Sequence, residues 1–270
     1  MRQFFSYGFL VLLLVSAPFV YAADMINIPA GSFTMGCSQG DSLCSAEEKP
    51  PGKVSVPTFL IDAKEVTVAE YRACVAAGKC KPPKTHSRNQ YCNYDAPKRD
   101  AHPVNCIDWA DAQNYCATQG KHLPREAEWE KAARAGSVTA YSWGKQASCR
   151  ELIGNDGKTT GSIKGEMDGC GEDRTWPVAS RAPNAWGLYD MLGNAGEWVA
   201  NGYAPDALAH YAKGDLDYPK ASSERVVRGG SWDEKLKNLR TSFRNSKPPV
   251  SGDVVYGSVG FRCVRDATSR

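Results

Sequence analysis

Histidine and closely spaced cysteines are scarce in this sequence. The 270 residues include only four histidines, at positions without ligand-like spacing, and the ten cysteines form no Cys-x-x-Cys pair. Structural zinc sites use such closely spaced cysteine and histidine ligands. We therefore expect no zinc site, and the same lack of spaced histidines argues against a non-haem iron centre.

An excess of one charge is also missing. The sequence has 33 Lys and Arg against 30 Asp and Glu, a formal net charge of +3, and no basic run stands out. Nucleic acids and anionic membrane surfaces select dense positive charge. We therefore expect neither of them as a partner.

Long apolar runs are confined to the N-terminus. Arg2 precedes an uninterrupted apolar stretch at residues 9–15, and Val20, Tyr21 and Ala22 follow in a small-x-small pattern. An apolar core this short, followed by a processing site, is typical of a secretory signal and not of a membrane span, which needs about 20 apolar residues. We predict a signal peptide at residues 1–22 and one exported domain at residues 23–270, periplasmic or secreted.

The cysteines fit that compartment. All ten lie after the predicted signal peptide, at Cys37, Cys44, Cys74, Cys80, Cys92, Cys106, Cys116, Cys149, Cys170 and Cys263. An even number of cysteines in an exported chain indicates disulfides. The pairing is not determined by the sequence alone.

Three helices are predicted in the first half of the chain. The first follows a capping box of Thr67 and Glu70 and ends at Gly78, the second covers residues 108–119, and the third begins at Pro124 and ends before Gly136. After Gly136 the chain is dense in Gly, Pro, Trp, Asn and Ser, with only short apolar runs. This pattern predicts short strands and long ordered loops without helices.

An ordered set of motifs runs through the chain. They are residues 28–36 (IPAGSFTMG), 103–109 (PVNCIDW), 120–130 (GKHLPREAEWE), 187–198 (GLYDMLGNAGEW), 228–232 (RGGSW) and 260–263 (GFRC). In this order the motifs resemble the formylglycine-generating enzyme, or sulfatase-modifying factor, family. The resemblance covers essentially all of residues 23–270.

The resemblance implies an α+β fold of the C-type-lectin-like kind, with little regular secondary structure, disulfide staples and bound calcium. In the family one Ca²⁺ is held by the segment that matches residues 193–197. The expected ligands here are Glu197 with Gly193, Asn194 and Ala195, oxygen donors of the kind that Ca²⁺ selects. For a second family calcium site, Asn155 or Asp168 would only partly substitute.

The resemblance also implies a disulfide between Cys116 and Cys263. For the other cysteines we propose Cys37–Cys44 and Cys74–Cys80 as local loops, Cys149–Cys170 across the Gly-rich insertion, and Cys92–Cys106 as the remaining pair. A different pairing could leave a free thiol.

The family's copper chemistry lacks its ligands here. Family enzymes oxidise a substrate cysteine to formylglycine with O₂ and a copper ion held by two cysteines, which follow the Gly-Gly-Ser motif. The matching segment, residues 233–240 (DEKLKNLR), contains no cysteine. Cu(I) requires soft thiolate ligands, so we expect no bound copper and leave the catalytic residues unassigned.

Other positions of the family's pocket are retained. Trp198 and Ser231 match residues that line it, and Ser258 stands where the family has an asparagine. Arg240 and Arg244 are further pocket candidates, although arginines of this kind more often pair with Asp and Glu. Trp198 and Trp232 could equally be core residues.

Three functions remain open at this level. The first is an exported maturation or modification factor that acts on a peptide or peptide-derived substrate, similar to the periplasmic pyoverdine-maturation proteins. The second is a calcium-stabilised, non-catalytic binding module for a peptide, protein or small molecule. The third is a formylglycine-generating oxidase, which the missing cysteines disfavour. In each case we expect a monomer.

Overall fold

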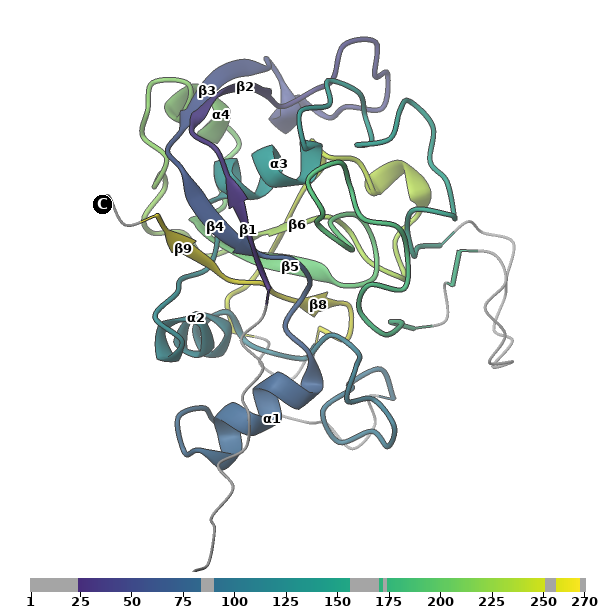
Figure 1. The fold of residues 1–270 in the computed structure, drawn as a ribbon. Coiled ribbons are helices and arrows are strands. Elements are labelled where there is room, and N and C mark those ends of the chain that lie inside the picture. The colour runs from purple at the N-terminus through teal and green to yellow at the C-terminus, as the bar shows by residue number, and fades with distance from the viewer. Residues whose placement is uncertain (1–23, 84–89, 156–169, 172–173, 251–255, 268–270) are drawn as a thin grey trace, which may run out of the picture.

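Three small sheets and three longer helices make up the fold (Figure 1). The computed structural model describes residues 24–83, 90–155, 170–171, 174–250 and 256–267. The first sheet has the order β1–β4–β9, the second pairs β2 with β3, and the third has the order β7–β6–β5–β8. The strands are β1 Met25–Ile28, β2 Gly31–Met35, β3 Gly52–Val56, β4 Phe59–Asp62, β5 Gly196–Gly202, β6 Arg225–Arg228, β7 Arg244–Lys247, β8 Val259–Gly260 and β9 Val264–Asp266.

The three predicted helices are present. They are α1 (Val68–Ala76), α2 (Trp109–Thr118) and α3 (Glu126–Arg134). Before α1, the Thr67 hydroxyl accepts a hydrogen bond from the Glu70 backbone N–H, and the Glu70 carboxylate accepts one from the Thr67 backbone N–H. This is the reciprocal capping box that the sequence indicated.

The expectation that the second half contains no helix is wrong at one place. Residues Ala207–Tyr211 form the short helix α4, and single 3₁₀ turns occur at Ala46–Glu48 and Leu236–Asn238. Leu208 and Tyr211 of α4 are buried in the core. A helix of five residues shows too little of the 3.6-residue period to be recognised in the sequence.

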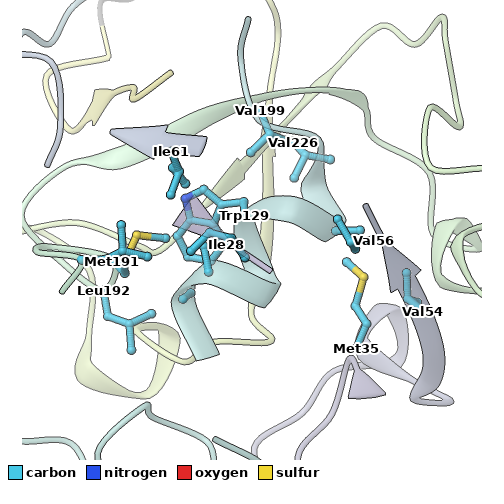
Figure 2. Packing of buried hydrophobic residues seen from close by; sticks show 14 of the residues in the cluster. Ile28, Met35, Val54, Val56, Ile61, Trp129, Met191, Leu192, Val199 and Val226 are labelled. Carbon is cyan, nitrogen blue, oxygen red and sulfur yellow. The ribbon is translucent and has the colours of Figure 1, made fainter. Parts of the chain in front are cut away.

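Helix α3 lies at the centre of the larger core cluster. The Trp129 side chain of α3 is fully buried, and Figure 2 shows it among Ile28, Ile61, Met191 and neighbouring aliphatic side chains. Every residue of α3 is buried, including its three glutamates. A buried carboxylate needs a hydrogen-bonded partner. Arginines of the third sheet are the partners of two of the three glutamates, Glu126 and Glu130.

A second core cluster lies on the other face of the third sheet. Trp198 of β5 belongs to this cluster, whereas its neighbour Val199 belongs to the cluster around Trp129. Successive side chains of a strand point to opposite faces, so β5 separates the two clusters. The second cluster contains Phe261 and the buried residues of α1 and α2.

Five disulfides include all ten cysteines, and no cysteine is free. The pairs are Cys37–Cys44, Cys74–Cys80, Cys92–Cys106, Cys116–Cys263 and Cys149–Cys170, the same five that the sequence analysis proposed. Such a disulfide content fits a protein outside the cytoplasm. Within the part of the chain that the structure describes, no helix has the length and apolar character needed to cross a membrane.

Candidate functional site

A glycine turn positions the retained serine and tryptophan of the motif at residues 228–232. Gly229 and Gly230 follow β6 with φ angles of +90° and +66°. A Cβ on Gly230 would lie 2.2 Å from a methyl carbon of Leu239, so only glycine fits this turn. The turn leads directly to Ser231, whose hydroxyl donates a hydrogen bond to the Asp233 carboxylate.

Aromatic rings surround the segment that leads into β8. Trp232 lies beside Tyr91, with ring centroids 4.9 Å apart, and its indole N–H donates to the Gly257 carbonyl oxygen at 3.3 Å. Tyr256 packs edge-on against Trp198 at 5.9 Å. Trp198 itself is fully buried and donates its indole N–H to the Ile107 carbonyl. Trp198 is therefore a core residue beneath the site, while Tyr91, Trp232 and Tyr256 form its aromatic wall.

Ser258 lies on the same segment, next to the parallel pairing of β5 and β8. Its carbonyl oxygen accepts a hydrogen bond of 2.8 Å from the Gly196 backbone N–H, and its side chain is partly exposed. Ser231 and Ser258 thus adjoin β6 and β8, the two strands that pair with β5, which carries Trp198. The structure brings together three of the five pocket candidates.

The other two candidates, Arg240 and Arg244, are not available to a ligand. Arg240 makes a two-pronged ion pair with Glu48, at 2.7 and 2.8 Å, and contacts Asp41 at 2.9 Å. Arg244 binds both carboxylate oxygens of Glu126. Both arginines are buried, so the expectation that they line the pocket is corrected: they neutralise interior carboxylates.

Glu234 is a candidate residue that none of the sequence motifs contains. It is half-buried three residues after Ser231, in the segment where the family's thiolates would be expected. One carboxylate oxygen accepts the Asn238 side-chain amide and the other accepts the Asn245 amide, both at 3.1 Å. Burial raises the pKa of Glu234 above its ordinary value, and the two amide donors only partly oppose this.

This arrangement suits proton transfer. Two neutral amides hold the carboxylate in one orientation without neutralising its charge, and each oxygen retains acceptor capacity. A carboxylate with a raised pKa is a stronger base than free glutamate, which is the usual property of a catalytic acid or base. The signal that could have identified it is a glutamate followed at four and eleven residues by asparagines.

The predicted calcium ligands lie in a buried charge cluster. The Glu197 carboxylate accepts hydrogen bonds from the Arg262 guanidinium at 2.7 to 2.9 Å and from the Trp129 indole at 2.8 Å. The Asn194 side chain accepts from the Trp176 backbone N–H and donates to Glu65. The side-chain oxygens that would ligate calcium at the predicted site, those of Glu197 and Asn194, therefore already accept hydrogen bonds from the protein.

The charge of this cluster is nevertheless unbalanced. Glu65, Asp190 and Glu197 are buried around Arg262, three carboxylates to one guanidinium. Burial, with the neighbouring carboxylates, raises the pKa of Glu65 well above its ordinary value and that of Asp190 to about 6. Bound protons or a cation would reduce this excess of negative charge, so the cluster fits Ca²⁺ in charge. In geometry it does not, because among the described residues no three Asp, Glu, His or Cys side chains converge as metal ligands, and Glu197 is already bonded to Arg262.

The second calcium site has little support from the described residues. The Asn155 backbone N–H donates to the Glu234 carbonyl oxygen at 2.9 Å, which ties this residue to the segment after Ser231. Asp168 lies outside the described residues.

A cavity of about 650 Å³ lies elsewhere, between α1 and the first sheet. Its lining includes Met25, Ala69, Ala73, Tyr115 and Arg265, and none of the candidate site residues. Of its four carboxylates, those of Asp62, Glu65 and Glu70 are hydrogen-bonded to protein donors. Because it lacks a set of converging polar groups free to act on a substrate, we place the functional site at Glu234 and the aromatic wall.

Comparison with known proteins identifies relatives along nearly the whole chain. The family model described as "Sulfatase-modifying factor enzyme 1-like domain" matches residues 14–267. The formylglycine-generating enzyme of Streptomyces coelicolor is 29% identical, with 90% of this chain and 89% of that protein aligned. The inactive C-alpha-formylglycine-generating enzyme 2 of Bos taurus is also 29% identical, with 90% and 88% aligned.

Solved structures agree with the fold. The structure of PvdO from Pseudomonas aeruginosa superposes with a TM-score of 0.69 at 29% identity, covering 90% of this chain and 94% of that one. Treponema denticola variable protein 1 superposes with a TM-score of 0.65 at 21% identity, covering 90% and 95%, a likeness in fold alone. These matches have the formylglycine-generating-enzyme, C-type-lectin-like fold that the motifs implied.

Proposed function

This chain belongs to the sulfatase-modifying factor enzyme 1-like family, and on that premise we propose that it is an exported maturation factor that modifies a peptide or peptide-derived substrate without a copper–thiolate centre. The observation that carries the proposal is the chemistry of the segment after the Gly-Gly-Ser turn. No cysteine of the chain is free to ligate Cu(I), and a half-buried, amide-held carboxylate stands at Glu234.

In this proposal Glu234 acts as the general base. Its ionised carboxylate accepts a proton from the substrate, and Asn238 and Asn245 hold it in position. Tyr91 and Tyr256 offer aromatic faces on which a peptide side chain or ring can pack, and Trp232 is buried against Tyr91. Ser231 is buried beneath them and donates its hydroxyl hydrogen bond to the exposed Asp233 carboxylate.

The experiment compares exported peptides and peptide-derived products of the natural host with and without the gene, by mass spectrometry. We expect an unmodified precursor to accumulate without the gene, and the wild-type chain to restore the product. The Glu234→Gln variant should restore less than about 1% of it, since loss of a general base costs about 10²- to 10⁴-fold in rate. Glu224→Gln is the matched control, because Glu224 is a half-buried glutamate that accepts a bond from Ser246.

The same comparison of exported products, with one copper-binding assay added, also distinguishes the alternative functions. Equal product with the Glu234→Gln variant would refute the proposed base. Stoichiometric Cu(I) binding, with O₂ uptake and oxidation of a cysteine-containing peptide, would instead support a formylglycine-generating oxidase. The inactive bovine relative favours a second candidate, a non-catalytic binding module. For that function we expect an unchanged product profile together with capture of a peptide ligand.

We also propose that Ca²⁺ stabilises the cluster around Glu197, supported by its excess of buried negative charge. Chelation with EDTA should then lower the melting temperature by several degrees, and added Ca²⁺ should restore it, because an ion that binds only the folded state stabilises that state. Differential scanning calorimetry measures both changes. An unchanged melting temperature after chelation would leave Arg262 as the only counter-ion of Glu197.

A further inference from the structure

Two positively charged residues face each other across β6 and β7. Arg225 and Lys247 are directly opposite in the antiparallel register, so their side chains leave the same face of the sheet. Like charges in this position repel each other. Within the described part of the chain, neither residue makes an ion pair with a carboxylate, whereas Arg228 at the other end of β6 pairs with both Glu126 and Glu130.

Each of the two cations lies over an aromatic ring. The Arg225 guanidinium is 3.9 Å from the centre of the Trp109 ring, and the Lys247 ammonium is 5.4 Å from that of Tyr256. The Trp109 indole is itself held by a 2.8 Å hydrogen bond to the Val199 carbonyl oxygen, where α2 packs against β5 (Figure 1). These contacts fix the positions of the cations without pairing either of them with a negative charge.

The hydrogen bonds of Arg225 are incomplete. One terminal nitrogen donates to the Ala200 carbonyl oxygen at 3.2 Å, but the buried Nε–H has no partner among the described residues. Buried donors in native proteins are nearly always satisfied by protein, water or ligand. Burial lowers the pKa of Arg225, and no carboxylate opposes this.

The acidic groups of this region have other partners. Glu224 accepts a hydrogen bond from Ser246, and Glu234 accepts its two amide bonds. Lys247 lies near enough to attract the Glu234 carboxylate, which partly opposes the rise in the Glu234 pKa, but the two groups form no ion pair in the described structure. Asp108 and Glu224 lie near Tyr256, and with burial they raise the pKa of its phenol. They do not form an ion pair with Arg225 or Lys247 in the described structure.

We propose that Arg225 and Lys247 form an anion clamp that holds a carboxylate of the substrate. This inference rests on the proposed function and specifies its substrate as a peptide or peptide derivative with a free carboxylate. Asn245, which holds Glu234, precedes Lys247 by two residues on the same face of β7. Two residues of strand span about 7 Å, so the bound carboxylate lies about two residue lengths from the Asn245 amide that holds the proposed base.

The clamp favours a carboxylate with an apolar or aromatic group attached. A guanidinium provides paired N–H donors that match the two oxygens of a carboxylate, and the ammonium adds a second charge. The rings of Trp109 and Tyr256 beside them exclude water on one side. A carboxylate of a peptide comes either from its C-terminus or from an Asp or Glu side chain, and the probes below distinguish the two.

The test is calorimetric titration of the full mature protein at low ionic strength with three probes. N-acetyl-L-phenylalanine presents a C-terminal carboxylate, N-acetyl-L-glutamate α-amide presents a side-chain carboxylate, and N-acetyl-L-phenylalaninamide has no charge. We expect at least one acid to bind tenfold or more tightly than the neutral amide. Arg225→Gln and Lys247→Gln should each remove that preference, whereas Lys213→Gln, at an exposed lysine, should keep it.

Stability measurements guard against a trivial loss of folding. Because the two cations repel each other, the ligand-free Lys247→Gln variant should melt at or above the wild-type temperature. A clear drop would assign Lys247 a structural role and overturn the clamp. Equal binding of acids and amide, binding of none, or unchanged binding in both variants would overturn it as well.

Failure of the clamp is distinguishable from failure of the proposed function. Probe binding needs no turnover, so Glu234→Gln should bind the acids while it fails to restore the product. The wild-type chain could form no product and still bind the acids more tightly than the amide in a way that depends on Arg225 and Lys247. That result would support the clamp and refute the maturation activity. Normal product formation without any acid preference would retain the maturation activity and overturn the clamp.

Discussion

Replacing both Cys116 and Cys263 with alanine should lower the free energy of unfolding by about 5 kcal/mol. This disulfide closes a loop of 147 residues and joins α2 to the residue before β9. In the chain-entropy model, a cross-link limits the unfolded chain more strongly as its loop grows, and this loop length corresponds to about 5 kcal/mol. Urea unfolding under non-reducing conditions measures the change.

The Cys37 and Cys44 double alanine variant is the matched control. Its loop spans only 7 residues, for which the same model gives about 2 kcal/mol. The first variant should therefore unfold at a clearly lower urea concentration than the second. Equal losses would show that the Cys116–Cys263 bond acts through native contacts and not through the unfolded chain.

Replacing Glu197 with glutamine should cost about 3–5 kcal/mol of stability, the range for removing one partner of a buried ion pair. Glu197 and Arg262 are both fully buried, and the guanidinium bonds both carboxylate oxygens. The glutamine keeps the shape of the side chain but leaves the Arg262 charge without its nearest counter-ion. The loss should be visible as a lower urea midpoint with an unchanged slope.

Two further variants test this interpretation. The double variant Glu197→Gln with Arg262→Met should lose more stability than Glu197→Gln alone, because it also removes the guanidinium that faces the buried Glu65 and Asp190 carboxylates. As a surface control, Asp100→Asn breaks the ion pair of Arg72 and Asp100, which are 37% and 67% exposed. Such exposed pairs contribute about 0–1 kcal/mol. A loss in the Glu197 variant no larger than in the control would contradict a stabilising role for the buried pair.

Family identity and local structure were predictable because they depend on neighbouring residues. The capping box of Thr67 and Glu70 is a short-range pattern with one physical solution, and glycines end the first three helices. The ordered motifs likewise predicted the fold class. Helix α4 was missed because its five residues are held mainly by packing of Leu208 and Tyr211.

The candidate site was only partly predictable. Trp198 and Ser231 follow from their motifs, and Ser258 from its position just before the motif at residues 260–263, but the roles of the arginines do not. Arg240 forms an ion pair with Glu48, which is 192 residues away in the sequence, and Arg244 forms one with Glu126, which is 118 residues away. No local pattern indicates which of several arginines is neutralised internally and which faces a ligand, since the partner is chosen by the packing of distant segments.

By itself, the sequence determined the disulfide-rich class of protein, the family, the first three helices and the absence of a cysteine from residues 233–240. Those features depend only on amino-acid composition and on the spacing of residues that are close in the sequence. The tertiary structure alone decided that Glu234 is held by Asn238 and Asn245, and that Arg225 faces Lys247. Strand register and loop closure bring these groups together, and both depend on the burial of apolar surface over the whole chain.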